Sequence, residues 1–135
     1  MRKRVVVTGI GTVNPLGNEV SVFWTALKAG KSGIGPNTKF DIAEYPAKIS
    51  GEVKDFDATD FLDKKEIRKM DNFTLYALKS ALEAMSDAGL RADNLDPERF
   101  GVIVGNGIGG IESLEEAYYR LYTGGPRRIP VFTIP

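Results

Sequence analysis

Three glycines stand at a spacing that binds phosphate in many nucleotide-binding proteins. Gly105, Gly107 and Gly110 fit G-x-G-x-x-G between an expected strand and an expected helix, where a pyrophosphate lies on the helix N-terminus. The first turns of that helix also carry three carboxylates, Glu112, Glu115 and Glu116. Carboxylates compete with phosphate for the positive end of a helix. We therefore interpret the glycines as close backbone packing at a strand-to-helix turn, and keep a nucleotide-binding module as an alternative.

Cations gather near the start of an expected long helix. Lys65, Arg68 and Lys69 share one face at i, i+3 and i+4 spacing. Composition alone favours a solvated helix face. However, cations near a helix N-terminus oppose the helix dipole, so their presence needs a compensating gain. Docking of an acidic or phosphate-bearing partner would supply it. Arg127 and Arg128 form a second exposed basic pair.

Three aspartates at three-residue spacing, Asp57, Asp60 and Asp63, are the only acidic cluster that suggests a metal. Calcium loops need denser oxygen ligands and a glycine for the turn. We therefore expect these carboxylates to cap the start of helices, and we expect no metal.

The composition excludes several chemistries. The 135 residues contain no Cys and no His, which removes a disulfide framework, a thiolate metal site, a Cys nucleophile and a His base from this chain. With 18 basic and 18 acidic residues, the net charge of +0 gives no field for gathering nucleic acid or an anionic membrane. The basic start precedes only three valines, so we expect no secretory or membrane segment and a cytoplasmic location.

The elements that position these residues follow from hydrophobic periodicity. β-rich runs that stop at glycine predict strands over 4–8 and 100–104, and alternation predicts a half-exposed strand over 48–54. A helix capped by Asn18 and stopped by Gly30 is expected first. Asp63 begins a long helix that reaches about residue 88, with Gly89 as its stop. The region 32–46 is expected to be a loop.

A further helix follows Gly110, with four apolar side chains expected to face inward: Ile111, Leu114, Tyr118 and Leu121. The alternation of strands and helices predicts an α/β sheet layered with helices, in one domain over residues 1–135. The end of the chain, residues 129–135, is apolar without a polar tail. An apolar end needs covering, so we expect the chain to be part of a larger fold.

An ordered set of motifs resembles the opening of the β-ketoacyl-acyl-carrier-protein synthases, and the elongation type most of all. The resemblance covers nearly the whole chain at family-like spacing. Its residues are 5–11 (VVVTGIG), 14–18 (NPLGN), Trp24, 30–34 (GKSGI), 68–71 (RKMD), 105–110 (GNGIGG) and 124–128 (GGPRR).

The resemblance implies a thiolase-like fold in which two similar α/β halves stack in layers and the enzyme is a homodimer. The chain is then the N-terminal part of the first half, an incomplete β-ketoacyl synthase N-terminal domain. The family's reaction needs no cofactor. An acyl group moves from acyl carrier protein to a Cys, malonyl-carrier protein loses CO2, and the resulting carbanion attacks the thioester, helped by two His residues and an oxyanion hole. Since Cys and His are missing, we expect no activity from this chain alone.

The resemblance also implies binding roles. It assigns Ile108 to the acyl-chain pocket, where a bulkier side chain limits chain length. Basic positions that meet the acidic carrier protein near the active-site entrance match Lys65, Arg68, Lys69, Arg127 and Arg128. One alternative keeps the fold without the chemistry: a chain-length-determining subunit of a polyketide synthase, which lacks the nucleophile. The residue at the nucleophile position, beyond this chain, distinguishes the two.

Overall fold

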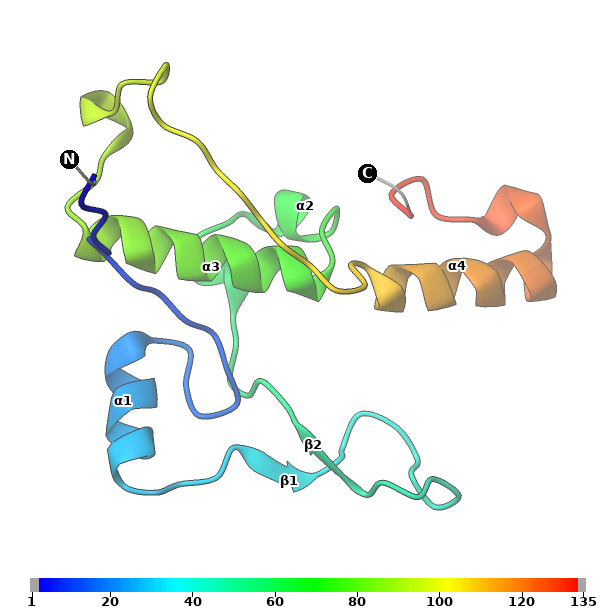
Figure 1. Cartoon of the computed structure of the whole chain (residues 1–135). Helices are drawn as coiled ribbons and strands as arrows, with labels where there is room; N and C mark the ends of the chain where they lie inside the picture. Colours follow the sequence, from blue (N-terminus) through cyan, green and yellow to red (C-terminus); the bar gives the residue numbers. More distant parts are fainter. Residues whose placement is uncertain (1–2, 134–135) are drawn as a thin grey trace.

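A computed structural model describes residues 3–133, and the backbone alone of residue 92. The helices are α1 (Val20–Lys28), α2 (Lys64–Ile67), α3 (Asn72–Asp87) and α4 (Ile111–Gly124), and the strands are β1 (Ile34–Pro36) and β2 (Ile49–Gly51). Short 3-10 turns are η1 (Ala58–Asp60), η2 (Ala92–Asn94) and η3 (Pro126–Arg128). Figure 1 shows α3 at the centre, α1 and the β1–β2 hairpin below it, and α4 extending to one side.

The N-terminal segment crosses α3 in direct backbone contact. A Cβ on Gly11 would lie 2.0 Å from the Ser80 carbonyl oxygen, and one on Gly9 would lie 2.2 Å from the Ala84 carbonyl oxygen. Only glycine fits at such distances from a rigid helix backbone. Gly9 and Gly11 therefore let an extended segment dock on the backbone of α3.

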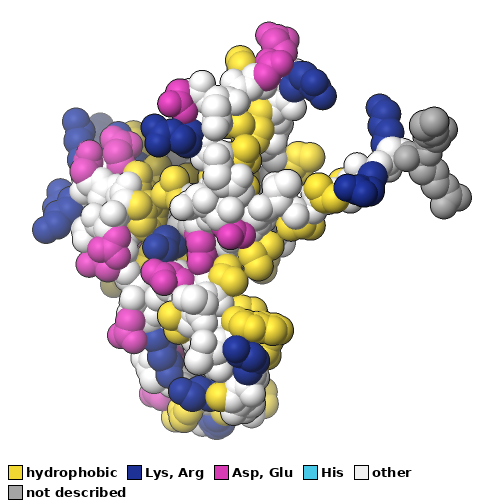
Figure 2. All heavy atoms as spheres, turned by 90° about the vertical axis from the view of Figure 1, so that its left-hand side faces the viewer, with side chains coloured by type: hydrophobic (Ala, Val, Ile, Leu, Met, Phe, Trp, Pro, Cys, Tyr) yellow, Lys and Arg dark blue, Asp and Glu magenta, His cyan; other side chains and the backbone are white. Residues whose placement is uncertain are grey.

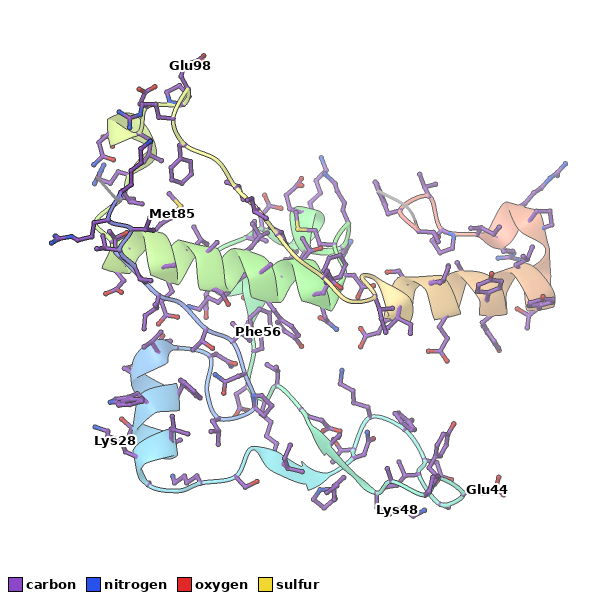
Figure 3. The ribbon with its side chains drawn as sticks, viewed as in Figure 1. Lys28, Glu44, Lys48, Phe56, Met85 and Glu98 are labelled. Atoms are coloured by element: carbon purple, nitrogen blue, oxygen red, sulfur yellow. The ribbon has the colours of Figure 1, made fainter. Side chains whose placement is uncertain are left out.

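The apolar core of the described residues is small. The buried apolar residues are Ala26, Ala58, Leu75 and Ala117. Phe56, labelled in Figure 3 below α3, packs its ring edge-on against Tyr76, with 4.8 Å between the ring centroids. The accessible surface is 11277 Å², whereas a compact monomer of 14.8 kDa has about 7,000 Å². Figure 2 accordingly shows hydrophobic side chains in patches at the surface, among charged ones.

Two expected strands have no partner in the part of the chain that the structure describes. The segments 4–8 and 100–104 carry no strand pairing, and Val5 and Ile103 are 91% and 98% exposed. A strand forms only when a neighbouring strand takes up its backbone hydrogen bonds. Both predictions were therefore wrong for this structure, although both segments are rich in β-branched residues.

The described sheet is a hairpin of two short strands. The strand expected over 48–54 is confirmed as β2, which pairs antiparallel with β1 so that Gly35 lies opposite Ser50. The interpretation of 32–46 as a loop was wrong at Ile34–Pro36. Glycine and proline in β1 weaken its strand signal, and its pairing with β2 overrides that local preference.

The long helix expected from Asp63 is two helices. Asp63 accepts hydrogen bonds from the backbone N–H groups of Lys65 and Glu66, as its predicted capping role requires, but α2 ends at Ile67. A new cap, Asp71, accepts from the N–H of Asn72 and begins α3. Gly89, with a φ of 65°, ends α3 as expected.

The expected cap of α1 was wrong. Asn18 donates its side-chain amide to the carbonyl oxygens of Lys54 and Asp55, at 2.8 and 3.2 Å. The first N–H of the helix, at Val20, is instead taken by a carboxylate from α3, Glu83, at 2.7 Å. The stop of this helix at Gly30, with a φ of 65°, is confirmed.

Helix α4 is confirmed, but its apolar face is not buried in the described residues. Ile111, Leu114 and Tyr118 are 53%, 48% and 54% exposed, and Leu121 is half-buried. The prediction that these side chains face inward was therefore wrong for Ile111, Leu114 and Tyr118 and holds in part for Leu121. Among the described helices, none combines the length and the apolar character needed to cross a membrane.

Candidate functional site

The basic residues at 65–69 lie on α2 and on the turn behind it. Arg68 is the C-cap residue, directly after the last residue of α2, and Lys69 follows it. The Lys69 ammonium forms an ion pair with Glu66, with 2.6 Å between Nζ and Oε1. Lys65 and Arg68 are exposed.

This geometry corrects the argument from the helix dipole. Because α2 has only four residues, Arg68 and Lys69 lie at its C-terminal end, where cations interact favourably with the last carbonyl groups. Of the three cations, only Lys65 stays in the opening turn. The position of Arg68 and Lys69 therefore carries no energetic penalty that a partner must offset.

A polar cavity of about 380 Å³ opens beside this turn. Its basic lining is Arg68 and Lys69, its acidic lining includes Glu112 and Glu116 of α4, and residues of the segment 130–133 complete it. The second basic pair, Arg127 and Arg128, lies on η3 at the far end of α4 (Figure 1). The structure thus brings Arg68 and Lys69 to one cavity and leaves Arg127 and Arg128 apart from it.

The glycine-rich turn before α4 is organised by Asn106. Its side-chain oxygen accepts hydrogen bonds from the backbone N–H groups of Ile108 and Gly109, at 2.9 and 2.6 Å. The Ile108 side chain is 77% exposed. A Cβ on Gly105 or Gly107 would meet no atom within 4 Å, so the expected close backbone packing was wrong at these two positions.

Gly110 is the glycine of this turn at which a side chain would collide with a neighbouring residue. A Cβ there would lie 2.7 Å from Oδ2 of Asp71. That oxygen accepts a hydrogen bond from the N–H of Ser113, in the first turn of α4, at 3.1 Å. The other oxygen, Oδ1, accepts from the N–H of Asn72 at 2.8 Å. One carboxylate therefore caps α3 and also occupies the N-terminus of α4.

The position of Asp71 argues against nucleotide binding at the glycine turn. A bound phosphate would lie where backbone N–H groups at the start of α4 point. A carboxylate already takes the Ser113 N–H group there, and a second anion would be repelled by it. Sequence reasoning missed Asp71, although an Asp before a helical run is an N-cap signal.

A second set of polar contacts ties the starts of α3 and α4 together. Asn72 donates its amide to Glu112 at 2.7 Å, and the other oxygen of Glu112 forms an ion pair with the Lys39 ammonium at 3.2 Å. The hydrogen bond to Glu112 raises the pKa of Lys39 above 10.5, against a smaller opposing effect of desolvation. The loop after β1, α3 and α4 thus meet at one polar cluster.

An apolar cavity of about 640 Å³ shares its wall with the polar one. Met70, Phe73, Leu114 and Phe132 supply its apolar lining, and Asp71 borders both cavities. Sequence reasoning missed this cavity, because its lining comes from three separated parts of the chain. A polar cavity and an apolar cavity that adjoin in this way can hold a ligand with a charged end and an apolar end.

The expected capping roles of two aspartates are confirmed. Asp57 accepts from the hydroxyl and the N–H of Thr59, at 2.7 and 2.8 Å, and these two bonds lower its pKa. Asp63 caps α2 as described above. Hydrogen bonding to backbone and hydroxyl groups therefore accounts for the spacing of these carboxylates.

Comparisons with known proteins match the chain over nearly its whole length. The family model described as "Beta-ketoacyl synthase, N-terminal domain" matches residues 2–133. A 3-oxoacyl-[acyl-carrier-protein] synthase 2 from Coxiella burnetii is 49% identical over 99% of this chain, and one from Synechocystis is 45% identical over the same share. The chain spans 32% of the length of each of these relatives.

Solved structures give the same result for the fold. The ishigamide ketosynthase/chain length factor matches 98% of this chain and 33% of its own, with a TM-score of 0.84 and 31% identity. A type II PKS acyl-carrier protein in complex with its ketosynthase bound to the hexaketide matches 97% of this chain and 34% of its own, with a TM-score of 0.73 and 27% identity. These matches confirm the α/β, thiolase-like layered fold expected from the sequence.

Proposed function

This chain belongs to the β-ketoacyl synthase family, and from that premise we propose that it forms the N-terminal part of a condensing enzyme of fatty-acid elongation. The observation that carries the proposal is the 49% identity to a 3-oxoacyl-[acyl-carrier-protein] synthase 2, which extends over 99% of the chain. The complete protein joins a malonyl unit, held on acyl carrier protein, to an acyl thioester.

The reaction proceeds in two transfers. The acyl group leaves the carrier thiol and forms a thioester with a Cys thiolate of the enzyme. Malonyl-carrier protein then loses CO2, and the carbanion attacks the acyl thioester and releases the thiolate. Because the 135 residues contain no Cys or His, these groups belong to the rest of the polypeptide. The complete protein is an acyltransferase that works in the cytoplasm as a homodimer.

The partner of the basic residues is acyl carrier protein. In support, Lys65 and Arg68 are exposed, Arg68 and Lys69 line the polar cavity, and a related ketosynthase has been solved in complex with its acyl-carrier protein. Exposed cations of this kind steer an acidic partner and fix its orientation. Arg127 and Arg128 form a second contact, at the far end of α4.

Charge reversal tests the docking role. In the complete protein, Lys65→Glu, Arg68→Glu and Lys69→Glu together are expected to raise KM for acyl-carrier substrates about tenfold at low salt, because each exposed pair contributes ~0.5 kcal/mol. High salt shrinks the effect by screening. The matched control reverses three exposed lysines elsewhere, Lys28, Lys31 and Lys54, with an equal change of charge. An unchanged KM in the first triple variant, or an equal rise in the control, contradicts the docking proposal.

Ile108 contacts the acyl chain. Its exposed side chain on the turn before α4 provides an apolar wall, and a larger side chain there shortens the space available. Ile108→Phe is therefore expected to slow elongation of long acyl chains while short ones are still extended. Equal rates for both, relative to the unchanged protein, contradict this role.

A non-catalytic chain-length-determining subunit is the second candidate, because the similarity to the ishigamide ketosynthase/chain length factor reaches a TM-score of 0.84. Such a subunit has no nucleophile. Incubation of the complete protein with acyl-carrier thioester distinguishes the two: an acyl group covalently bound to one Cys supports the enzyme, and its absence supports the subunit.

A further inference from the structure

The starts of α3 and α4 are held together by few contacts in the described residues. Along α4, only Ala117 is buried, and Ile111 and Leu114 are about half exposed. The bonds that reach α4 from α3 are those of Asp71 to Ser113 and of Asn72 to Glu112, at 3.1 and 2.7 Å. Apolar packing contributes little here, so polar bonds fix where α4 begins.

Asp71 makes the more restrictive of these two contacts. Its carboxylate bonds rigid backbone at both ends, the N–H of Asn72 and the N–H of Ser113, whereas the Asn72–Glu112 bond joins two flexible side chains. Hydrogen bonds of backbone N–H groups to a carboxylate are among the stronger ones in proteins. The close approach of Gly110 to Asp71 is part of the same arrangement.

Asp71 also connects the basic residues proposed to bind acyl carrier protein with the turn that carries Ile108, the residue proposed to contact the acyl chain. Arg68 and Lys69 precede Asp71 in the chain, and the turn that carries Ile108 precedes the Ser113 that Asp71 binds. Asp71 borders both the polar cavity of Arg68 and the apolar cavity. A displacement of this carboxylate therefore shifts the start of α4, and with it Ile108, relative to the basic residues.

We propose that Asp71 is a positioning residue: by capping α3 and α4 with one carboxylate, it sets the place of Ile108 and so the discrimination among acyl chain lengths. The inference rests on the function proposed above and deepens it. Asp71 itself touches no substrate. It acts through the backbone of α4.

Two variants disturb the contact from opposite sides. Asp71→Asn leaves one acceptor oxygen for two N–H groups and directs an amide N–H₂ at one of them. Gly110→Ala keeps the charge of Asp71, but its Cβ would lie 2.7 Å from Oδ2 and pushes the carboxylate away from Ser113. The backbone at Gly110 has a φ of −78°, which alanine tolerates.

The matched control is Asp63→Asn. Asp63 is also an N-cap aspartate, but both N–H groups that it binds, those of Lys65 and Glu66, belong to its own helix. Both bonds go to one oxygen, Oδ1, which asparagine keeps, so Asp63→Asn removes the negative charge at the start of α2 and leaves α4 untouched. The loss of a charge at a helix start therefore acts in the control and in Asp71→Asn alike, whereas a shift of α4 acts only in Asp71→Asn and Gly110→Ala.

The experiment measures kcat/KM of the complete protein for a series of acyl-carrier substrates from short to long. Asp71→Asn and Gly110→Ala are each expected to lower the ratio between the preferred and the disfavoured chain lengths about tenfold, equivalent to ~1.4 kcal/mol. Asp63→Asn is expected to leave that ratio within about twofold, because asparagine caps a helix about as well as aspartate and the contact between α3 and α4 is unchanged. A ratio preserved in Gly110→Ala, or lost equally in Asp63→Asn, overturns the inference.

The outcomes separate this inference from the function on which it rests. If circular dichroism shows that the Asp71→Asn protein does not fold, the result for Gly110→Ala decides alone. If the unchanged protein condenses no acyl-carrier substrate, the proposed function and the inference both fall. If it condenses them and the two variants keep its chain-length ratio, the inference alone falls.

Discussion

Replacing Glu83 by Gln is expected to loosen the N-terminal segment and α1 from α3. The Glu83 carboxylate accepts the N–H of Thr12 through Oε2 at 3.0 Å and the N–H of Val20 through Oε1 at 2.7 Å. Glutamine offers one acceptor oxygen for these two donors and turns an amide N–H₂ toward the other. The same helix start also loses a stabilising negative charge.

The magnitude follows from these two bonds. Losing one hydrogen bond to a charged acceptor costs about 1.5 to 3 kcal/mol, and the lost charge at the start of α1 adds about 0.5 kcal/mol. We expect a total of at least about 2 kcal/mol, which corresponds to roughly thirtyfold or more faster amide exchange wherever these bonds limit opening.

Amide hydrogen exchange of the peptides that contain Thr12 and Val20 measures this effect. The matched control is Glu116→Gln, because Glu116 pairs with Arg120 across one turn of α4 and both side chains are about half exposed. Such a pair contributes about 0.3 kcal/mol. Exchange in the Glu83→Gln protein that is no faster than in the control refutes the bridging role of Glu83.

Two further predictions concern backbone approach and pH. Gly11→Ala is expected to lower the melting temperature by several degrees, because its Cβ would lie 2.0 Å from the carbonyl oxygen of Ser80 and such overpacking costs about 1 to 3 kcal/mol. The control is Gly35→Ala, because a Cβ there meets open space. Equal changes of the melting temperature in the two variants contradict the close approach of Gly11 to α3. Hydrogen bonds from the N–H and hydroxyl of Thr38 lower the pKa of Glu52 below 4.5, so the folded state gains stability above that pH and loses it as the pH falls through the lowered value. The protection of the Thr38 amide, taken relative to its intrinsic exchange rate at each pH, is expected to fall over that acidic range in the unchanged protein and to stay constant in Glu52→Gln. Constant protection in the unchanged protein contradicts the assignment.

Local signals predicted the helices better than the strands. Helices α1 and α4 and the stops at Gly30 and Gly89 follow from residues within a few positions of each boundary. The segments 4–8 and 100–104 contain good strand residues, but strand formation depends on partners far along the chain. No local pattern reveals whether such a partner is present.

Carboxylates explain most of the remaining differences. Asp71 interrupts the long apolar periodicity after Asp63, because a cap at the right place competes with helix continuation. Glu83 replaces Asn18 as the acceptor for the first N–H of α1 from 63 residues away, which sequence spacing does not encode. The basic residues were singled out by their spacing and exposure, whereas Ile108 was found only through the resemblance to a family, since an exposed isoleucine has no distinctive local pattern.

The most direct test of the central claim is condensation by the complete protein. Acyl-carrier protein and malonyl-carrier protein substrates are mixed with it, and CO2 release and the mass of the carrier-bound product are followed together. We expect one CO2 to be released for each acyl chain that is extended to a β-ketoacyl thioester. Absence of an extended product with every acyl-carrier substrate, while the protein is folded, would contradict it.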